Sequence, residues 1–340
     1  MEYKQILFTA PGLAEFVDYT PAPLGADQVR VQTVVSTISN GTERANLIGD
    51  MNINSGRSAE KTHGFPRALG YSSSGVVLEV GEHVKNIAVG DRVVVSWSKH
   101  MSVNTLKEKD VIKIGDENIT FEEAALMHIA TFPMAAIRKA RLEMGESVIV
   151  MGLGILGLMA VQLARVAGAV PVIAVDPVAD RREKALTYGA DYALDPTEPD
   201  FAETVKQLTG GGAKVGIEVT GIGAGLDGIL DGMARYGRVA LLGCTRDKNF
   251  SIDYYRKVHG PGITLIGAHT MARPKEESAP GWFTQQDDIR ALLKLTSLGR
   301  LNLSQMIEET YSPAECEAVY ARLASGRAFP TVVQFDWTRL

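Results

Sequence analysis

The feature that most constrains the fold of this chain is a glycine-rich turn between a buried strand and a helix. In VIVMGLGILGLMAVQLA, Gly152, Gly154 and Gly157 directly follow an apolar strand and open a helical stretch, with the spacing GxGxxG. The first glycine of such a turn permits the tight bend, the second lets the backbone approach a pyrophosphate, and the third lets helix and strand pack closely. The free N–H groups at the helix start favour a phosphate. This pattern predicts a dinucleotide-binding region.

The chain after this turn keeps alternating between strands and helices. Apolar strands are expected in SVIVMG, PVIAVD, VGIEVTG, RVALLG and TLIGAH, separated by helix-length stretches such as ADRREKALTYGAD and FAETVKQLTG. Near-continuous apolar strands with helices between them predict a parallel sheet covered on both faces. The segment TGGGAK leads into a strand and not into a helix, so we interpret it as a surface turn.

An acidic residue stands where a dinucleotide ribose is recognised. Asp176 ends the second of these strands, 19 residues after Gly157, and a carboxylate there accepts hydrogen bonds from the ribose hydroxyls. Because a carboxylate repels a 2′-phosphate, we expect NAD in preference to NADP. Arg181 and Arg182 could hold that phosphate if the loop folds back, but we favour a solvated helix face for both. The expected cofactor contacts are Gly152, Gly154, Ile155, Leu156, Gly157, Asp176, Arg181, Thr220, Gly243 and Ala268.

The first third of the chain has a different hydrophobic pattern. VRVQTVV, SGVVLEV and DRVVVSW are short apolar runs with period-two alternation, which indicates a β-rich region. Helical patterns begin with NITFEEAALM, where Thr120 can cap a helix with Glu123 three residues further on.

Length and composition narrow the class of protein. We expect two domains, each with its own hydrophobic core, from 340 residues, because a chain with a single core rarely exceeds about 250–300 residues. We predict a catalytic domain of residues 1–121 and 271–340, which regains the last strand in PTVVQFDW, and a dinucleotide domain of residues 122–270. With 45% hydrophobic residues and a net charge of -5, the chain has no broad basic field, so we expect no nucleic-acid partner.

The expected location is the cytoplasm. Cys244 and Cys316 are too few for a disulfide framework or a four-cysteine zinc site within one chain, which fits a reducing compartment. MEYKQILFTAPG shows no basic segment followed by an apolar one, as a secretion signal would. Gln162, Arg165 and Pro171 interrupt the most apolar stretch, so we expect no membrane span.

The order of these regions resembles the medium-chain dehydrogenase/reductase family of zinc-type alcohol dehydrogenases. SNGTERANL, LGYSSSGVVLEVGEHV, VGDRVVV, VIVMGLGILG, VDP, IEVTG and GRVALLG follow the family's order over most of the chain. The resemblance implies an α/β fold, in which a partly open, GroES-like β-barrel forms the catalytic domain and a doubly wound Rossmann domain binds the dinucleotide. It also implies a homodimer or homotetramer that associates through the edge strand in TLIGAHT.

The family's places for zinc ligands carry other residues in this chain. The resemblance puts Asn40 at the cysteine place, Tyr71 at the histidine place and His128 near the third place, and DRVVVSWSKHMSVN runs through the region of the structural-zinc cysteines. Asparagine and neutral tyrosine are poor zinc ligands. A rearranged site of Glu43, His63 and His128 is the alternative, although their spacing matches no zinc motif. We predict a zinc-independent member, resembling the group with bacteriochlorophyllide dehydrogenase and sugar or cyclitol dehydrogenases.

Alcohol oxidation without zinc requires a protein group that takes the hydroxyl proton while hydride leaves for the nicotinamide. The resemblance implies that Thr42, Tyr71 and His128 converge on that hydroxyl. His128 titrates nearest neutral pH and is the first candidate for the base. Tyr71 could donate a hydrogen bond, or act as acid and base if a cation lowers its pKa. Thr42 matches the family's proton-relay hydroxyl, and Glu43 matches the acid that supports a ligand.

Each of these residues also has a structural interpretation. His128 follows the helical run EEAALM and could be a core histidine, and Tyr71 could pack at the barrel edge beside four small residues. Glu43 could instead pair with Arg44 or Arg67.

Asn40, His63 and Trp97 are the candidate substrate contacts. His63 and Trp97 could equally lie at the surface, as could Lys99 and His100 in the same loops. The adjacent pair Asp287 and Asp288 cannot share one helical face, so we interpret both as solvated.

The predicted function is NAD-dependent, zinc-independent oxidation of a secondary hydroxyl of a polyol, cyclitol or sugar derivative. One alternative is a reductase of quinones or activated double bonds; such family members also carry asparagine in the front motif, but they usually take NADPH, which Asp176 disfavours. The other alternative is a non-catalytic dinucleotide-binding protein that has kept the fold. The expected partner is a small alcohol or sugar-like molecule.

Overall fold

The computed structural model describes residues 3–50, 64–245, 249–326 and 329–340, and the chain divides into two compact units. Unit 1 contains Met1–Ile129, Ile289–Gly299 and Leu303–Leu340, and unit 2 contains Ala130–Asp288 and Arg300–Asn302. Two of the changes from one unit to the other, apart from those that flank Arg300–Asn302, lie inside helices, namely α3 (Met127–Lys139) and α8 (Gln285–Ser297). These crossings lie beyond residues 121 and 270, where the sequence placed the domain limits, because each helix continues across the change of unit.

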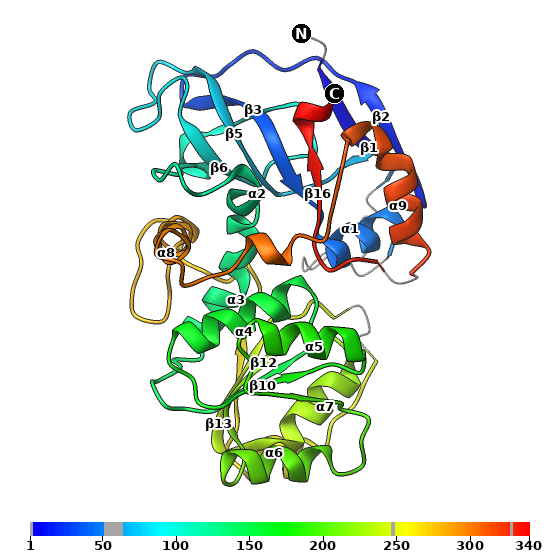
Figure 1. Cartoon of the computed structure of the whole chain (residues 1–340), viewed down its shortest axis with the longest axis vertical. Helices are drawn as coiled ribbons and strands as arrows, with labels where there is room; N and C mark the ends of the chain where they lie inside the picture. The colour runs from blue at the N-terminus through cyan, green and yellow to red at the C-terminus, as the bar shows by residue number, and fades with distance from the viewer. Residues whose placement is uncertain (1–2, 51–63, 246–248, 327–328) are drawn as a thin grey trace. The chain divides into compact units, whose positions relative to one another are not determined.

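Unit 2 is built on a six-stranded parallel sheet with the strand order β11-β10-β9-β12-β13-β14; strands β10, β12 and β13 are labelled in Figure 1. The chain therefore begins at the centre of the sheet, fills one side and then returns to fill the other, which is the doubly wound order. The strands are β9 (Val148–Met151), β10 (Val172–Val175), β11 (Tyr192–Leu194), β12 (Ala213–Glu218), β13 (Met233–Leu241) and β14 (Thr264–Gly267). The connecting helices are α4 (Ile155–Val166), α5 (Ala179–Thr187), α6 (Phe201–Thr209), α7 (Gly223–Asp231) and the π-helical turn η2 (Tyr255–His259).

The helices of unit 2 cover the sheet in two pairs. Helix α4 contacts α5, and α6 contacts α7; right-handed crossovers place such pairs on opposite faces of the sheet. Ile149, Ile173 and Val239 of the strands pack in one buried cluster with Val205 of α6 and Ile229 of α7. All five strands expected from the sequence are present, and β14 is an edge strand as predicted.

Unit 1 contains two sheets of mostly antiparallel strands. A three-stranded sheet has the order β2-β1-β4, and a seven-stranded sheet has the order β15-β16-β3-β5-β6-β8 with β7 paired to β3. The strands are β1 (Lys4–Ala10), β2 (Leu13–Asp18), β3 (Gln28–Thr37), β4 (Arg67–Ala68), β5 (Ser72–Val80), β6 (Arg92–Ser96), β7 (Val103–Lys107), β8 (Val111–Lys113), β15 (Glu309–Tyr311) and β16 (Val333–Asp336). Strand β16, red in Figure 1, pairs antiparallel with the blue β3, so the last strand returns to the first region as predicted.

Two hydrophobic clusters stabilise unit 1. Val31, Val77 and Val95 belong to the cluster between the strands of the larger sheet, and Phe8 and Phe335 belong to the other. The helices and helical turns are α1 (Asn40–Leu47), η1 (Glu108–Asp110), α2 (Phe121–Ala124), η3 (Ser304–Met306), η4 (Pro313–Glu315), α9 (Cys316–Ala324) and η5 (Trp337–Arg339). Thr120 and Glu123 form the predicted capping box of α2.

The predicted α/β fold class, with a β-rich catalytic region and a Rossmann sheet, is confirmed. None of the helices in the described part of the chain combines the length and apolar character that a bilayer crossing requires.

Candidate functional site

The glycine-rich turn lies between β9 and α4, and its glycines have the conformations and clearances that a dinucleotide requires. Gly152 has a φ of 97°, and a Cβ there would meet the Thr220 side chain at 2.8 Å. A Cβ at Gly157 would lie 1.9 Å from the Gly152 carbonyl oxygen, so only glycine lets α4 approach the turn. Gly154 caps α4 and faces open space at the helix N-terminus, where a phosphate can bind.

Asp176 follows β10, as the sequence predicted, but its carboxylate is already engaged by the protein. Its Oδ2 accepts the Leu153 N–H at 2.9 Å, and its Oδ1 accepts the Val178 N–H at 2.9 Å. The side chain is only 4% exposed, whereas that of Arg181, whose Nη1 lies 3.4 Å from Oδ2, is 43% exposed. The Asp176 carboxylate therefore holds the backbone of the glycine-rich turn. Arg181 forms an ion pair with Asp176, so it is not only a solvated residue of α5.

A buried carboxylate that was not among the predicted site residues joins the ends of two neighbouring strands. Glu218, the last residue of β12, accepts the Thr220 and Gly221 N–H groups at 2.8 and 3.1 Å and also the Thr220 hydroxyl. The Glu218 carbonyl accepts the Gly243 N–H at 2.8 Å. Burial raises the pKa of this acid. Two predicted cofactor residues, Thr220 and Gly243, are thus held by one residue, whose only sequence signal was an acid inside an apolar strand.

The other predicted cofactor residues differ in exposure. Ile155 is 7% exposed and Leu156 is half-buried. We therefore expect a ligand at the N-terminus of α4 to contact the backbone N–H groups of these residues and not their side chains. Ala268, which follows β14, is 1% exposed, and its N–H donates to the Leu241 carbonyl at 3.0 Å.

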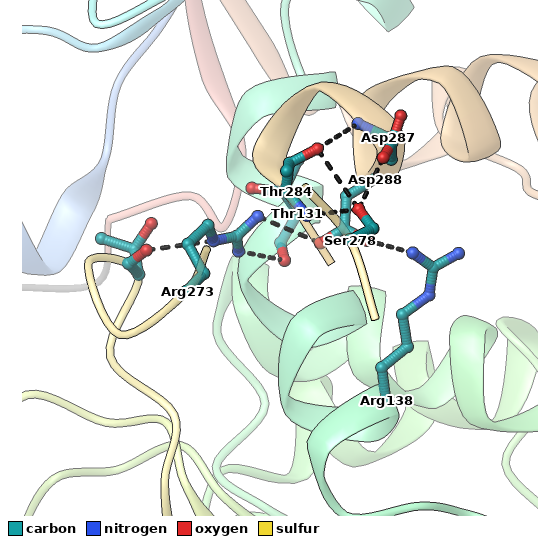
Figure 2. Close-up of polar contacts among 8 residues, drawn as sticks. Thr131, Arg138, Arg273, Ser278, Thr284, Asp287 and Asp288 are labelled. Atoms are coloured by element: carbon teal, nitrogen blue, oxygen red, sulfur yellow. Dashed lines mark hydrogen bonds and ion pairs between the residues drawn. The ribbon is translucent and has the colours of Figure 1, made fainter. Parts of the chain in front are cut away.

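Figure 2 shows a polar cluster of unit 2 in which Asp288 lies between two arginines. Arg273 Nη1 donates to Asp288 Oδ2 at 3.0 Å, and Arg138 Nη1 donates to Asp288 Oδ1. Arg273 also donates to the Thr131 carbonyl at 3.0 Å, which ties the segment after β14 to α3. The Asp288 side chain is fully buried, so its interpretation as a solvated residue is wrong. The first turn of α8 directs this acid inward, while the neighbouring Asp287 stays partly exposed.

Lys139, in the last turn of α3, is a buried amine near this cluster. Its Nζ donates to the Gly267 carbonyl at 3.3 Å and lies 5.0 Å from the centroid of the Trp282 ring. Burial, and then the charge of Arg273, lower the pKa of Lys139 to about 8. Gly267 is the last residue of β14, so this amine supports the backbone directly before Ala268.

Three of the predicted site residues form an aromatic group in unit 1. The rings of Tyr71 and Trp97 both meet the His128 imidazole edge-on, with centroid distances of 5.4 and 4.7 Å. The Trp97 N–H donates to the Tyr71 carbonyl at 2.8 Å, and Trp97 has a φ of 60°, a left-handed conformation that disfavours a bulky residue. His128 is fully buried, Tyr71 is half-buried and Trp97 is 36% exposed. A molecule that approaches this group meets Trp97 and Tyr71 before the imidazole.

The polar groups at two former zinc-ligand places are engaged within the protein. The Tyr71 hydroxyl donates to Ser39 Oγ. Asn40 Nδ2 donates to the carbonyls of Pro330 and Thr331 at 2.8 and 3.2 Å. A protonated phenol and an amide are weak ligands for zinc, and the described residues contain no group of three His, Cys, Asp or Glu side chains that could hold a metal ion. Asn40 and Tyr71, at two of the three places that the family resemblance gives for zinc ligands, therefore suit that metal poorly.

Glu43 points into the interior of unit 1. Its side chain is fully buried, and its Oε2 accepts the Tyr320 hydroxyl at 2.5 Å and lies 3.1 Å from His100 Nε2. Its Oε1 accepts the Ser39 N–H at 2.8 Å. The alternative that Glu43 pairs with Arg44 or Arg67 is wrong, because histidine, tyrosine and backbone donors occupy the carboxylate.

The remaining predicted residues of this region are dispersed. Thr42 is half-buried in α1, and its carbonyl accepts Asn46 Nδ2 at 2.9 Å. His63 lies outside the described residues. His100 is 1% exposed, so the surface position considered for it is wrong, whereas Lys99 is exposed. Ser39 was not among the predicted site residues, and its contact with Tyr71 spans 32 residues of sequence.

Comparisons with known proteins show which families and enzymes this chain is similar to. The family model of the alcohol dehydrogenase GroES-like domain matches residues 25–131, and that of the zinc-binding dehydrogenase matches residues 156–284. The chain is 28% identical to D-guloside 3-dehydrogenase of Shigella flexneri over 334 residues, which cover 93% of this chain and 95% of that protein. It is 30% identical to L-threonine 3-dehydrogenase of Pyrococcus abyssi over 280 residues, which cover 72% and 75%.

A solved structure shares the fold over nearly the whole length. Benzyl alcohol dehydrogenase from Acinetobacter calcoaceticus matches with a TM-score of 0.83 and 20% sequence identity, covering 99% of each chain.

Proposed function

Since this chain belongs to the zinc-type alcohol dehydrogenase family of medium-chain dehydrogenases/reductases, and is therefore an oxidoreductase of CH–OH groups, we propose that it uses NAD and no zinc to oxidise a secondary hydroxyl of a polyol, cyclitol or sugar derivative. The observation that carries the proposal is the chemistry at the former ligand places. Asn40 and Tyr71 donate their hydrogen bonds to Pro330, Thr331 and Ser39, which is the behaviour of protein hydrogen-bond donors and not of metal ligands.

NAD would be held by unit 2. Gly152, Gly154 and Gly157 leave room for a pyrophosphate at the start of α4, and bound NAD would accept the hydride from the carbinol carbon. The Asp176 carboxylate lies beside the turn, where its charge opposes a 2′-phosphate. Arg181 Nη1 lies 3.4 Å from the Asp176 carboxylate. Because this cation offsets part of the negative charge, Asp176 repels a 2′-phosphate less than an isolated acid would.

The protein's own groups would handle the hydroxyl proton. The Tyr71 hydroxyl donates to Ser39, and a phenol oxygen can also accept a hydrogen bond from an alcohol. His128 contacts the Tyr71 ring, and its imidazole is the group that would take the proton. Trp97 offers an exposed apolar surface to the carbon skeleton. Thr42, on the same helix as Asn40, is included as the second hydroxyl of the site.

The substrate class has support from the relatives. D-guloside 3-dehydrogenase, similar over 93% of this chain, is named for oxidation of a sugar derivative at one ring position. A partly exposed tryptophan beside polar groups, as Trp97 is here, suits the apolar face and the hydroxyls of a sugar ring.

The proposal is tested by metal analysis combined with a substrate screen. We expect purified protein to contain less than about 0.1 zinc per chain and to keep its activity after a strong chelator. It should reduce NAD, followed by nicotinamide absorbance, with a polyol, cyclitol or sugar. Stoichiometric zinc with chelator-sensitive activity would contradict zinc independence. Turnover of quinones or enones with no alcohol oxidised would favour the reductase.

Two substitutions test the assigned groups. Tyr71→Phe and His128→Ala should each lower kcat at least about tenfold, because acid/base help is lost. NADH affinity, measured by fluorescence, should stay within about twofold, since neither residue is among the expected cofactor contacts. Full activity in both variants would contradict the assignment of Tyr71 and His128 to acid/base roles.

A further inference from the structure

Glu43 and His100 form a buried pair to which the reaction proposed above gives no role. Their side chains are 0% and 1% exposed, and Ser36 Oγ lies 2.8 Å from His100 Nδ1. Trp337 Nε1 donates to the same Ser36 oxygen at 2.9 Å. The Ser36 hydroxyl hydrogen is thereby left for Nδ1, and Nε2 then carries the hydrogen that His100 gives to Glu43.

The carboxylate of this pair is fully satisfied. Burial and the charge of Glu43 raise the pKa of Tyr320 well above its ordinary value, so Tyr320 stays a donor to Oε2. His100 donates to the same oxygen, and the Ser39 N–H donates to Oε1. A buried charge persists only when it has such partners, so these contacts fix Glu43 in one position.

Glu43 in turn fixes Ser39. The Glu43 N–H donates to the Ser39 carbonyl at 2.8 Å, as in any α-helical turn, and the Glu43 side chain accepts the Ser39 N–H at 2.8 Å. A serine at an N-cap normally uses its hydroxyl on the first turn of the helix. Ser39 makes no such side-chain bond, and its hydroxyl instead accepts the Tyr71 phenol.

His100 fixes the backbone that carries Tyr71. Gly70 has a φ of 102°, and a Cβ there would lie 2.9 Å from the His100 nitrogen and 3.0 Å from its ring. The His100 N–H donates to the Leu69 carbonyl at 2.8 Å. The two residues before Tyr71 therefore pack directly on His100.

We propose that Glu43 and His100 are positioning residues for the Tyr71 hydroxyl. Glu43 holds the acceptor Ser39, His100 holds the backbone before Tyr71, and together they direct the phenol hydrogen at Ser39. The inference rests on the proposed function and extends that site by Ser39, Glu43 and His100.

A double-mutant cycle in the full-length protein tests this role. His100→Asn should lower kcat for the best polyol about tenfold, with the KM for NAD within about twofold. In a Tyr71→Phe background the same change should lower kcat by less than about twofold, because positioning a hydroxyl that is gone has no further effect. Glu43→Gln, which keeps the shape of the side chain, should behave in the same way. Ser39→Ala should lower kcat, and Ser39→Thr should restore most of it.

A matched control is the exposed His83–Glu82 pair, whose nitrogen and oxygen lie 3.8 Å apart; His83→Asn should leave kcat unchanged. An equal loss of kcat from His100→Asn with and without the Tyr71 hydroxyl would overturn the inference, as would full activity of both His100→Asn and Glu43→Gln. If His100→Asn fails to fold, the cycle with Glu43→Gln decides. A wild-type protein that oxidises no polyol would overturn the proposed function as well, whereas an active one with an additive cycle would overturn this inference alone.

Discussion

Replacing Lys139 by methionine tests the electrostatics beneath β14. Lys139 is 6% exposed, and burial together with Arg273 lowers its pKa from 10.5 to about 8. A lowered pKa means that the folded protein binds this proton less tightly than the unfolded chain does. The charge therefore disfavours folding at pH 7, and the penalty disappears as the pH rises from about 8 towards 10.5.

The magnitude follows from the size of the shift. The pKa of Lys139 falls from 10.5 to about 8, which at 1.36 kcal/mol per pH unit corresponds to about 3 kcal/mol for complete release of the penalty. The part released between pH 7.5 and pH 10 is about 2 kcal/mol, because the unfolded lysine also begins to lose its proton there. We therefore expect the free energy of unfolding of the wild type, minus that of Lys139→Met, to rise by about 2 kcal/mol over this range.

Urea unfolding followed by circular dichroism at both pH values measures this difference. Other groups titrate alike in both proteins, so the subtraction isolates Lys139. Lys275→Met, at an exposed position of unit 2, should give a difference that does not change with pH. A flat difference for Lys139→Met, or an equal rise in both variants, would refute the reasoning.

Three further predictions concern the cofactor turn, the choice of cofactor and the assembly. Gly157→Ala brings a Cβ to 1.9 Å from the Gly152 carbonyl oxygen and should lower both the melting temperature and the NADH affinity. Gly154→Ala places its Cβ in open space in the protein, so it should leave the melting temperature unchanged and lower the NADH affinity about tenfold. Arg181→Ala should leave the KM for NAD within about threefold and reduce any residual NADP activity, because it removes the cation that a 2′-phosphate would use; a gain in NADP activity would contradict this. Leu265→Lys changes a residue 37% exposed on the edge strand β14 and should convert the proposed homo-oligomer to a monomer in sedimentation velocity, whereas Val89→Lys, at a residue 63% exposed in unit 1, should not.

The sheet of unit 2 could be predicted because its signals are local. Each of the strands β9, β10, β12, β13 and β14 is an apolar run bounded by glycine, proline or acid, and the glycine-rich turn marks where the first strand ends. Strand β11 gave no comparable signal, since it has three residues and its Tyr192 is 42% exposed. The inward turn of Asp288 was equally hidden, because its partner Arg138 lies 150 residues away.

The candidate site of unit 1 could be predicted only where a motif supplied the register. Tyr71 and His128 were found by their alignment with ligand places. His100 and Tyr320 were not, because their contacts with Glu43 span 57 and 277 residues and leave no periodicity in the sequence. Ser39 was hidden for another reason: a serine before a helix suggests a cap, and here its hydroxyl serves Tyr71 instead.

The partners of Glu43 explain how such a site can keep its shape once its ligands are replaced. The family resemblance makes Glu43 the acid that supports a metal-binding histidine, and this chain has Tyr71 at that place. An acid left buried without donors would destabilise the fold by several kcal/mol. Here His100, Tyr320 and the Ser39 N–H supply those partners, so the carboxylate stays fixed in one position. Because Ser39 also receives the Tyr71 hydroxyl, the bonds that stabilise the acid are the same bonds that orient the group in the ligand's place.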